Sequence, residues 1–236
     1  MCFLKLRSLR MATVVVLLGC SQSLSANSVF NVVTGFSYTS NPNGVWTYEL
    51  SGAPYTDSQG FSNVNGLGLP GWWNGKGEPD SMAILQNVTG STFIFSTDQD
   101  PTGTLLLDPE SGNNSVVFTA PSAGTYTITG NFLGIDTSQN SHPVEILDNA
   151  TVVWSETISS FKQDDSFNLN ETLSAGDTIS FYVGTGSAGC SYCDLGTGLD
   201  GTITLNTTAT PEPDTLALFG SGLLVLAAAA RRRLRK

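Results

Sequence analysis

The central part of this chain, residues 27–210, contains short runs in which large apolar and small polar side chains alternate. In Thr125–Thr129 (TYTIT), one face of an extended strand would carry the large side chains and the other face the threonines. Thr202–Leu205 (TITL) repeats the pattern. A period of two residues with one polar face is typical of antiparallel sheets. No stretch here has a persuasive helical period, so the sequence predicts an all-β body.

Ten runs with strand character stand out between turns rich in Gly, Asn, Pro and Ser. About ten to twelve strands in this length suggest an antiparallel two-sheet sandwich, most simply a jelly roll. We predict one β-sandwich domain over residues 27–206, because no linker supports a division near residue 80. The runs are Val45–Leu50, Thr92–Ser96, Thr104–Leu107, Ser115–Ala120, Gly124–Leu133, Val144–Leu147, Thr151–Glu156, Ser166–Leu169, Asp177–Val183 and Gly201–Asn206.

The charges are distributed unevenly along the chain. Residues 27–210 hold eighteen acidic side chains but only Lys76 and Lys162 as cations, which leaves this body a formal charge of −16. Nucleic-acid phosphates are bound through Lys and Arg, so nucleic acid is excluded as a partner. Like-charge repulsion also disfavours anionic membrane surfaces and acidic polysaccharides.

The N-terminus is typical of a secretory signal peptide. Basic residues precede the apolar run Met11–Gly19, which is too short to span a bilayer as a helix. Ser23 and Ser25 suit the small-residue positions before a signal-peptidase cut, so we expect residues 1–25 to be removed. The alternative is a lipoprotein cut before Cys20 in the sequence LLGC.

The C-terminus places a Pro-Glu-Pro tripeptide, an uncharged run and a basic cluster in that order. The fifteen uncharged residues would span about 22 Å as a helix, and the stems of flanking arginines can extend this span. We predict a linker over residues 207–214 and a single transmembrane helix with a basic tail over residues 215–236, with the body outside the cytoplasm. The basic cluster comprises Arg231, Arg232, Arg233, Arg235 and Lys236.

This tail resembles the PEP-CTERM sorting signal of Gram-negative bacteria. The resemblance implies that Pro211, Glu212 and Pro213 form the motif recognised by exosortase, a membrane protease-transferase. Two prolines hold such a segment extended and outside the helix, which leaves it open to an enzyme. The resemblance also implies a bacterium that makes exopolysaccharide. The protein would be anchored transiently in the membrane and then reach the cell surface or the extracellular matrix.

The later part of the body, residues 104–206, is similar to exported bacterial jelly-roll domains of the carbohydrate-binding-module type. The similarity rests on APSAGTY at residues 120–126 and AGDTISF at residues 175–181. In each motif we expect the glycine to allow a tight turn with positive φ before a strand. Such motifs mark the turns of a sandwich and do not specify a ligand.

Aromatic residues are the best candidates for a ligand site. Trp72, Trp73 and Asn74 lie in the loop-like sequence GWWNG, where exposed indole rings could stack on sugars and an amide could bond to hydroxyls. The alternative is that both tryptophans pack on the core. We expect Trp46 and Trp154, which lie inside strands, to belong to the core.

Histidine and cysteine offer little chemistry. The single histidine, His142, precedes Pro143 and is expected to be an exposed loop residue. No nucleophile elbow or phosphate loop is present in the sequence, and no βαβ pattern provides the context of a dinucleotide fingerprint. Cys190 and Cys193, in CSYC, are expected to form a disulfide in an oxidising compartment, with free thiols as the alternative.

Acidic loop residues are weak candidates for a structural calcium site, because carboxylates are hard oxygen ligands. The alternative is that they are solvated loop acids, and no other cofactor is expected. The candidates are Asp98, Asp100, Asp194 and Asp200.

Two functions from different classes fit this sequence. We favour a non-catalytic protein of the cell surface or exopolysaccharide matrix, with polysaccharide as candidate ligand and with signal peptidase and exosortase as partners during export. The alternative is a small exported glycan-active hydrolase that uses paired carboxylates. A cleft with two carboxyls about 5–10 Å apart, one with a raised pKa, would favour the hydrolase.

Overall fold

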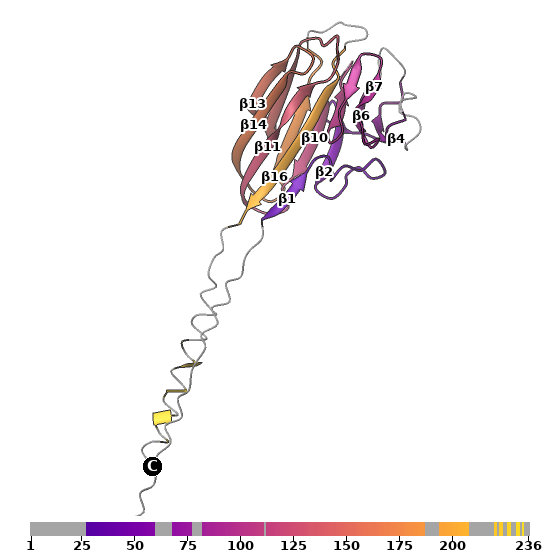
Figure 1. Ribbon diagram of the computed structural model, residues 1–236. Helices are drawn as coiled ribbons and strands as arrows, with labels where there is room; N and C mark the ends of the chain where they lie inside the picture. The colour runs from indigo at the N-terminus through magenta and orange to yellow at the C-terminus, as the bar shows by residue number, and fades with distance from the viewer. Residues whose placement is uncertain are drawn as a thin grey trace, which may run out of the picture. The chain divides into compact units, whose positions relative to one another are not determined.

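The structure is a computed structural model, and it describes most of the body together with eight positions near the C-terminus (Figure 1). Those eight positions are helical, and no helix within the described residues is long and apolar enough to cross a membrane. The predicted signal peptide, Pro-Glu-Pro tripeptide and cysteine pair lie outside the described residues. The described residues are 27–59, 68–76, 82–110, 112–186 and 194–207, with 220, 222, 223, 226, 227, 230, 231 and 233.

The described body consists of β-strands. They are β1 (Ser28–Asn31), β2 (Trp46–Leu50), β3 (Ala53–Pro54), β4 (Asp57–Gln59), β5 (Gly71–Trp73), β6 (Ala83–Gln86), β7 (Phe93–Phe95), β8 (Asp98–Asp100), β9 (Leu105–Asp108), β10 (Asn114–Thr119), β11 (Gly124–Gly134), β12 (His142–Asp148), β13 (Thr151–Ile158), β14 (Asp164–Leu173), β15 (Thr178–Val183) and β16 (Thr197–Asn206).

The strands form two large antiparallel sheets and one hairpin. The eight-stranded sheet has the order β14-β11-β16-β9-β6-β5-β4, with β1 paired to β16. The six-stranded sheet has the order β13-β12-β15-β10-β2-β3, and β7 pairs with β8. The predicted all-β sandwich is therefore confirmed.

The last eight strands, β9 to β16, form a jelly roll. Four of them are neighbours in one sheet in the order β14-β11-β16-β9, and the other four in the second sheet in the order β13-β12-β15-β10. This arrangement is that of two Greek keys folded into facing sheets. The earlier strands extend the two sheets at their edges, so the N-terminal part enlarges a jelly roll that the C-terminal part already closes.

The two turn glycines of the sequence motifs differ from each other. Gly176 has a φ of +93°, as predicted for the turn before β15. Gly124 does not adopt a positive φ, so that part of the expectation is wrong. A Cβ at this position would collide with the side chain of Leu205 on β16. The Leu205 side chain thus packs directly over position 124, and a larger residue there would require that side chain to shift.

The main core lies between the two sheets. Trp46 is buried in it, as predicted. Trp154 is partly buried and stacks on Phe132 with ring centroids 5.8 Å apart. The largest fully buried side chains are Tyr48, Tyr126, Phe118, Phe132 and Phe181.

A smaller hydrophobic cluster lies on the outer face of the eight-stranded sheet. Along β6 and β9 its members Leu85 and Leu106 alternate with Ile84 and Leu105 of the main core, so these strands are apolar on both faces. Phe93 of β7 packs on the cluster, and the β7–β8 hairpin thus helps to cover this half of the face. The buried members of the outer cluster are Leu69, Ala83, Leu85, Leu106 and Ile135.

The other half of the same outer face, over β14, β11 and β16, is polar and accessible to solvent. Its outward side chains form rows across the three strands. Three neighbouring rows, with three residues in each, contain only Thr and Asn, and we call this surface the Thr/Asn face. Its residues are Thr125, Thr127 and Thr129 of β11, Asn168, Asn170 and Thr172 of β14, and Thr202, Thr204 and Asn206 of β16.

Candidate functional site

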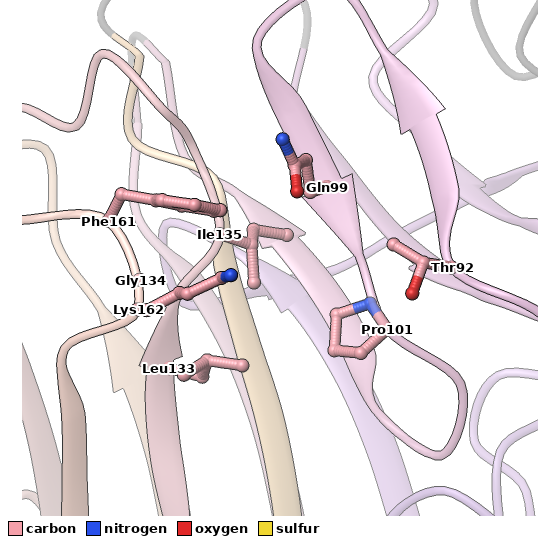
Figure 2. Close-up of a pocket in the computed structure, with 8 residues that line it drawn as sticks. All are labelled: Thr92, Gln99, Pro101, Leu133, Gly134, Ile135, Phe161 and Lys162. Carbon is pink, nitrogen blue, oxygen red and sulfur yellow. The ribbon is translucent and has the colours of Figure 1, made fainter.

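A cavity of about 160 Å³ lies between the β7–β8 hairpin and the end of β11. Figure 2 shows Leu133, Phe161 and Lys162 on one side of it and residues of the hairpin region on the other. The cavity therefore lies between the jelly roll and a segment added by the N-terminal part of the chain. The lining residues are Thr92, Gln99, Pro101, Leu133, Gly134, Ile135, Phe161 and Lys162.

One wall of the cavity is the turn between β13 and β14, which carries Phe161 and Lys162. The Lys162 N–H donates to the Gly134 carbonyl oxygen at 2.7 Å, and the Gly134 N–H donates to the Gln163 carbonyl oxygen at 2.9 Å. A Cβ at position 134 would collide with the Ser160 carbonyl oxygen, so this close approach requires glycine. The backbone of the turn that carries the half-buried Phe161 and the exposed Lys162 is therefore fixed against the end of β11.

Lys162 is one of the two cations of the acidic body. Its side chain is exposed, and Nζ lies 5.0 Å from the centroid of the Phe161 ring. Within the described part of the chain it has no ion-pair partner. The ammonium and the aromatic ring, beside Leu133 and Ile135, give the cavity both apolar surface and a strong hydrogen-bond donor.

The opposite wall is docked to the jelly roll through its backbone. The Gln99 N–H donates to the Ile135 carbonyl oxygen at 2.8 Å, and Asp98 and Asp136 form an antiparallel bridge beside it. Successive side chains of extended segments point to opposite sides. Gln99 and Ile135 line the cavity, whereas Asp98 and Asp136 do not.

Four carboxyl groups gather on the other side of this docking contact, those of Asp98, Asp100, Asp136 and Asp194. Asp98 and Asp136 are hydrogen-bonded to each other. Burial, and then the charges of the neighbouring carboxylates, raise the pKa of Asp98 to about 8. Burial raises the pKa of Asp100 to about 7, against the lowering effect of the Thr104 hydroxyl. Two touching carboxylates resist being ionised together, which adds to the effect of burial on the pKa of Asp98.

The structure brings together three of the four predicted calcium candidates. Asp98, Asp100 and Asp194 are joined by Asp136, which follows a strand and carries no sequence signal of its own. Asp200 lies apart from them on the outer face of β16. One buried oxygen each of Asp98 and Asp100 has no hydrogen-bond partner. The described residues contain no group of three His, Cys, Asp or Glu side chains arranged to hold a metal ion, and calcium binding stays a prediction.

The two consecutive tryptophans of β5 point to opposite faces of the sheet. Trp72 is 3% exposed, belongs to the main core, and donates from Nε1 to the Ser37 carbonyl oxygen at 2.8 Å. Its ring therefore has no free face for a sugar, and for Trp72 the core alternative applies. Trp73 is partly buried against the outer cluster, and the Asn74 side chain accepts from the Lys76 N–H at 3.1 Å. None of the three predicted residues lines the cavity of Figure 2.

The expectation that His142 is an exposed loop residue is wrong. It begins β12 and is 1% exposed. Nε2 lies 2.7 Å from the Thr197 hydroxyl and Nδ1 lies 2.9 Å from the Asn140 carbonyl oxygen. Burial lowers the pKa of His142, which favours the neutral form of the ring. Its partner Thr197 lies far away in the sequence, which explains why a local pattern does not reveal this buried contact.

Residues 209–233 match the family model of the PEP-CTERM protein-sorting motif. The chain therefore carries this sorting motif, as the resemblance of its tail implied, and the matched span includes Pro211, Glu212 and Pro213. A comparison with curated proteins finds no match.

Solved structures similar to this chain include several β-sandwich domains. A family 35 carbohydrate-binding module from an environmental isolate is 20% identical, with a TM-score of 0.33 over 54% of this chain and 98% of that one. A family 35 module from Clostridium thermocellum is 12% identical, with a TM-score of 0.29 over 78% and 100%. Pika GITRL is 19% identical, with a TM-score of 0.28 over 40% and 78%. At these values the likenesses carry no argument about function.

Proposed function

We propose that this protein is an exported, non-catalytic polysaccharide-binding protein of the cell surface or extracellular matrix. The match of residues 209–233 to the sorting motif is the observation that carries the export part. Signal peptidase would remove residues 1–25, and exosortase would process the tail after a transient stay in the membrane. The predicted Cys190–Cys193 disulfide would form in the same oxidising compartment.

The cavity of Figure 2 is the site that we propose for one sugar residue. A sugar ring presents apolar C–H faces and a rim of hydroxyls. Phe161, Leu133 and Ile135 match the faces, and Gln99 and Lys162 match the hydroxyls. The cavity is smaller than the roughly 300–1,000 Å³ of most ligand pockets, so it suits a chain end or a branch rather than a long segment.

The carboxyl cluster gives the hydrolase alternative no support. The two carboxyls of a glycosidase lie about 5–10 Å apart and flank the scissile bond. Asp98 and Asp136 instead touch each other, Asp136 is 2% exposed, and neither lines the cavity. We therefore propose binding rather than catalysis.

The position of the cavity fits a protein that is tethered by its tail. Thr197, the first residue of β16, pairs with Gly134 beside the cavity, whereas the strand ends at Asn206. A strand of this length spans about 30 Å. At its far end the Asn27 side chain accepts from the Thr207 N–H at 3.1 Å, so the chain enters and leaves the body together. Both ends of the described body therefore lie at the end of β16 that is opposite to the cavity.

Affinity electrophoresis of residues 26–207, which form one compact unit, tests the binding part. Polysaccharide in the gel should retard the wild-type body, and both Phe161→Ala and Lys162→Ala should reduce the retardation. Lys76→Ala removes the only other cation of the body and is the matched control. Equal retardation of Lys162→Ala and wild type would remove the cavity from the proposal.

Mass spectrometry of the protein released from cells tests the sorting part. We expect no peptide beyond about residue 215, and we expect substitution of Pro211 and Pro213 by alanine to keep the tail attached. A released wild-type protein that retains Arg231–Lys236 would contradict processing.

A further inference from the structure

The Thr/Asn face is organised before any ligand arrives. The Thr127 hydroxyl donates to Asn170 Oδ1 at 2.8 Å, and Asn206 Nδ2 donates to the Thr127 oxygen at 2.9 Å. On the next row, Asn31 Nδ2 of β1 donates to the Thr202 hydroxyl oxygen at 3.1 Å. Side chains from neighbouring strands thus support one another, which fixes the direction of the hydroxyl and amide groups that remain open to solvent.

The Thr/Asn face is also free of charge in a body whose formal charge is −16. The outer face of the six-stranded sheet is different. There, a row that crosses the sheet from β12 to β2 begins with Glu145 and ends with Glu49. Acidic residues thus lie within a row across one outer face of the sandwich. On the other outer face the nine Thr/Asn positions are uncharged, and Asp200 lies at the next outward position of β16 beyond Thr202. A neutral surface inside an acidic field favours a neutral ligand, because the surrounding charge repels an acidic one.

The dimensions of the Thr/Asn face suit an extended ligand. Neighbouring strands lie about 4.8 Å apart, and outward residues two positions apart on one strand are separated by about 6.6 Å. From β14 to β16 the face is therefore about 10 Å wide, and three rows extend it about 13 Å along the strands. It carries no aromatic ring, so binding would depend on many weak hydrogen bonds along a chain, each in competition with water.

We propose that the Thr/Asn face binds a neutral, hydroxyl-rich polysaccharide that lies flat across β14, β11 and β16. This inference rests on the proposed function and adds a second binding surface to the cavity of Figure 2. Threonine hydroxyls and asparagine amides both donate and accept hydrogen bonds, as sugar hydroxyls do. The cavity takes one residue and the face takes a length of chain, so one molecule can hold two polysaccharide chains together.

The triple variant Thr127→Val, Thr129→Val, Thr204→Val tests this proposal, because valine keeps the β-branched shape and removes the hydroxyl. The probes are the neutral polysaccharides dextran, mannan and mixed-linkage β-glucan, with polygalacturonate as the acidic comparison. Affinity electrophoresis should show at least tenfold weaker binding of the triple variant to the neutral polymer that retards the wild type. The double variant Thr151→Val, Thr157→Val, at exposed positions of β13, is the matched control and should bind within twofold of wild type.

A second variant tests whether a loss of binding in the triple variant could result from misfolding. Asn168→Arg places a long side chain at an exposed position, and it should also block the neutral polymer while its melting temperature stays near that of wild type. Unchanged binding of both variants, or a wild-type preference for polygalacturonate, would overturn the inference. If Phe161→Ala abolishes binding and the valine variant does not, the result supports the proposed function and contradicts binding at the Thr/Asn face. If no polymer retards the wild type, the result contradicts both proposals.

Discussion

The two halves of the outer face of the eight-stranded sheet belong to one backbone layer but have opposite surfaces. Over β9 and β6 the outward residues are apolar, and a hairpin from the N-terminal part helps to cover them. At the nine Thr/Asn positions of β14, β11 and β16 they are polar and uncharged, and the surface is accessible to solvent. The boundary runs between neighbouring strands, where Leu106 of β9 stands opposite Gly198 of β16. The outer face of this sheet thus has one half that is covered by packing and one half that is accessible to solvent.

The covered half and the open half of this outer face also differ in the hydrophobic pattern of their strand sequences. A strand with one wet face alternates, as Thr125–Thr129 does, whereas a strand covered on both faces is continuously apolar. Leu105–Leu107 is such a run, and its three consecutive leucines are all buried. Continuous apolar character in a short strand therefore indicates a second layer, which here is supplied by residues that precede the jelly roll.

The largest effect should come from the paired tryptophans, which divide between the inner core and the outer cluster. Trp72→Ala removes a buried indole and its hydrogen bond to the Ser37 carbonyl, and should cost about 3–5 kcal/mol of unfolding free energy. Trp73→Ala should cost clearly less, because this side chain is only partly buried. Urea denaturation of the two single variants measures the difference. Equal, small losses would contradict the placement of Trp72 in the core.

Truncation in the covered half should have the next largest effect. Leu106→Ala leaves a cavity beneath the hairpin, and we expect a loss of about 2–4 kcal/mol. Phe93→Ala should loosen the hairpin specifically and increase hydrogen exchange at the Gln99 amide, which donates to Ile135. Unchanged protection of that amide in Phe93→Ala would show that the hairpin does not depend on the outer cluster.

The docking of the hairpin should also depend on pH. The pKa of Asp98 is raised in the folded state, so between about pH 4 and pH 8 the folded protein binds more protons at this site than the unfolded chain does. This contribution is complete below pH 4 and is lost as the pH rises through about 8. Asp98→Asn lacks the titration, so the wild type should lose roughly 1–3 kcal/mol relative to the variant across this window.

The measurement is the unfolding free energy of both proteins at several pH values, with EDTA present to remove divalent cations. Parallel pH profiles for wild type and Asp98→Asn would contradict the raised pKa of Asp98. A repeat with added calcium reports on the predicted cation site, because a bound cation would replace the proton and stabilise the wild type at high pH.

The smallest effect should come from the open half. Thr204→Val removes a hydroxyl that faces solvent and keeps the preferred shape of a strand residue, so its unfolding free energy should change by no more than about 0.5 kcal/mol. Thermal melting of this variant beside Leu106→Ala compares the two halves directly. A loss in Thr204→Val as large as that in Leu106→Ala would mean that the open half is part of the packing.

Much of the fold is predictable from local pattern. All ten predicted strands are present with ends shifted by a few residues, including every strand of the jelly roll. The strands that the sequence does not reveal, among them β5, β6 and β8, have four residues or fewer, so an alternation with period two cannot be recognised in them. Their pairing is stabilised by neighbours rather than by their own composition.

Features that depend on residues close together in the chain are predictable from the sequence. These are the alternation that makes the body all-β, the acidic charge of that body, and the sorting motif in the tail. Three other features depend on tertiary packing: Trp72 enters the core, His142 is buried, and Gln99 and Lys162 line one cavity. Each of these depends on which side of a strand faces a distant segment. A shift of one residue in strand register would reverse that side, so these features are decided by packing between residues far apart in the chain.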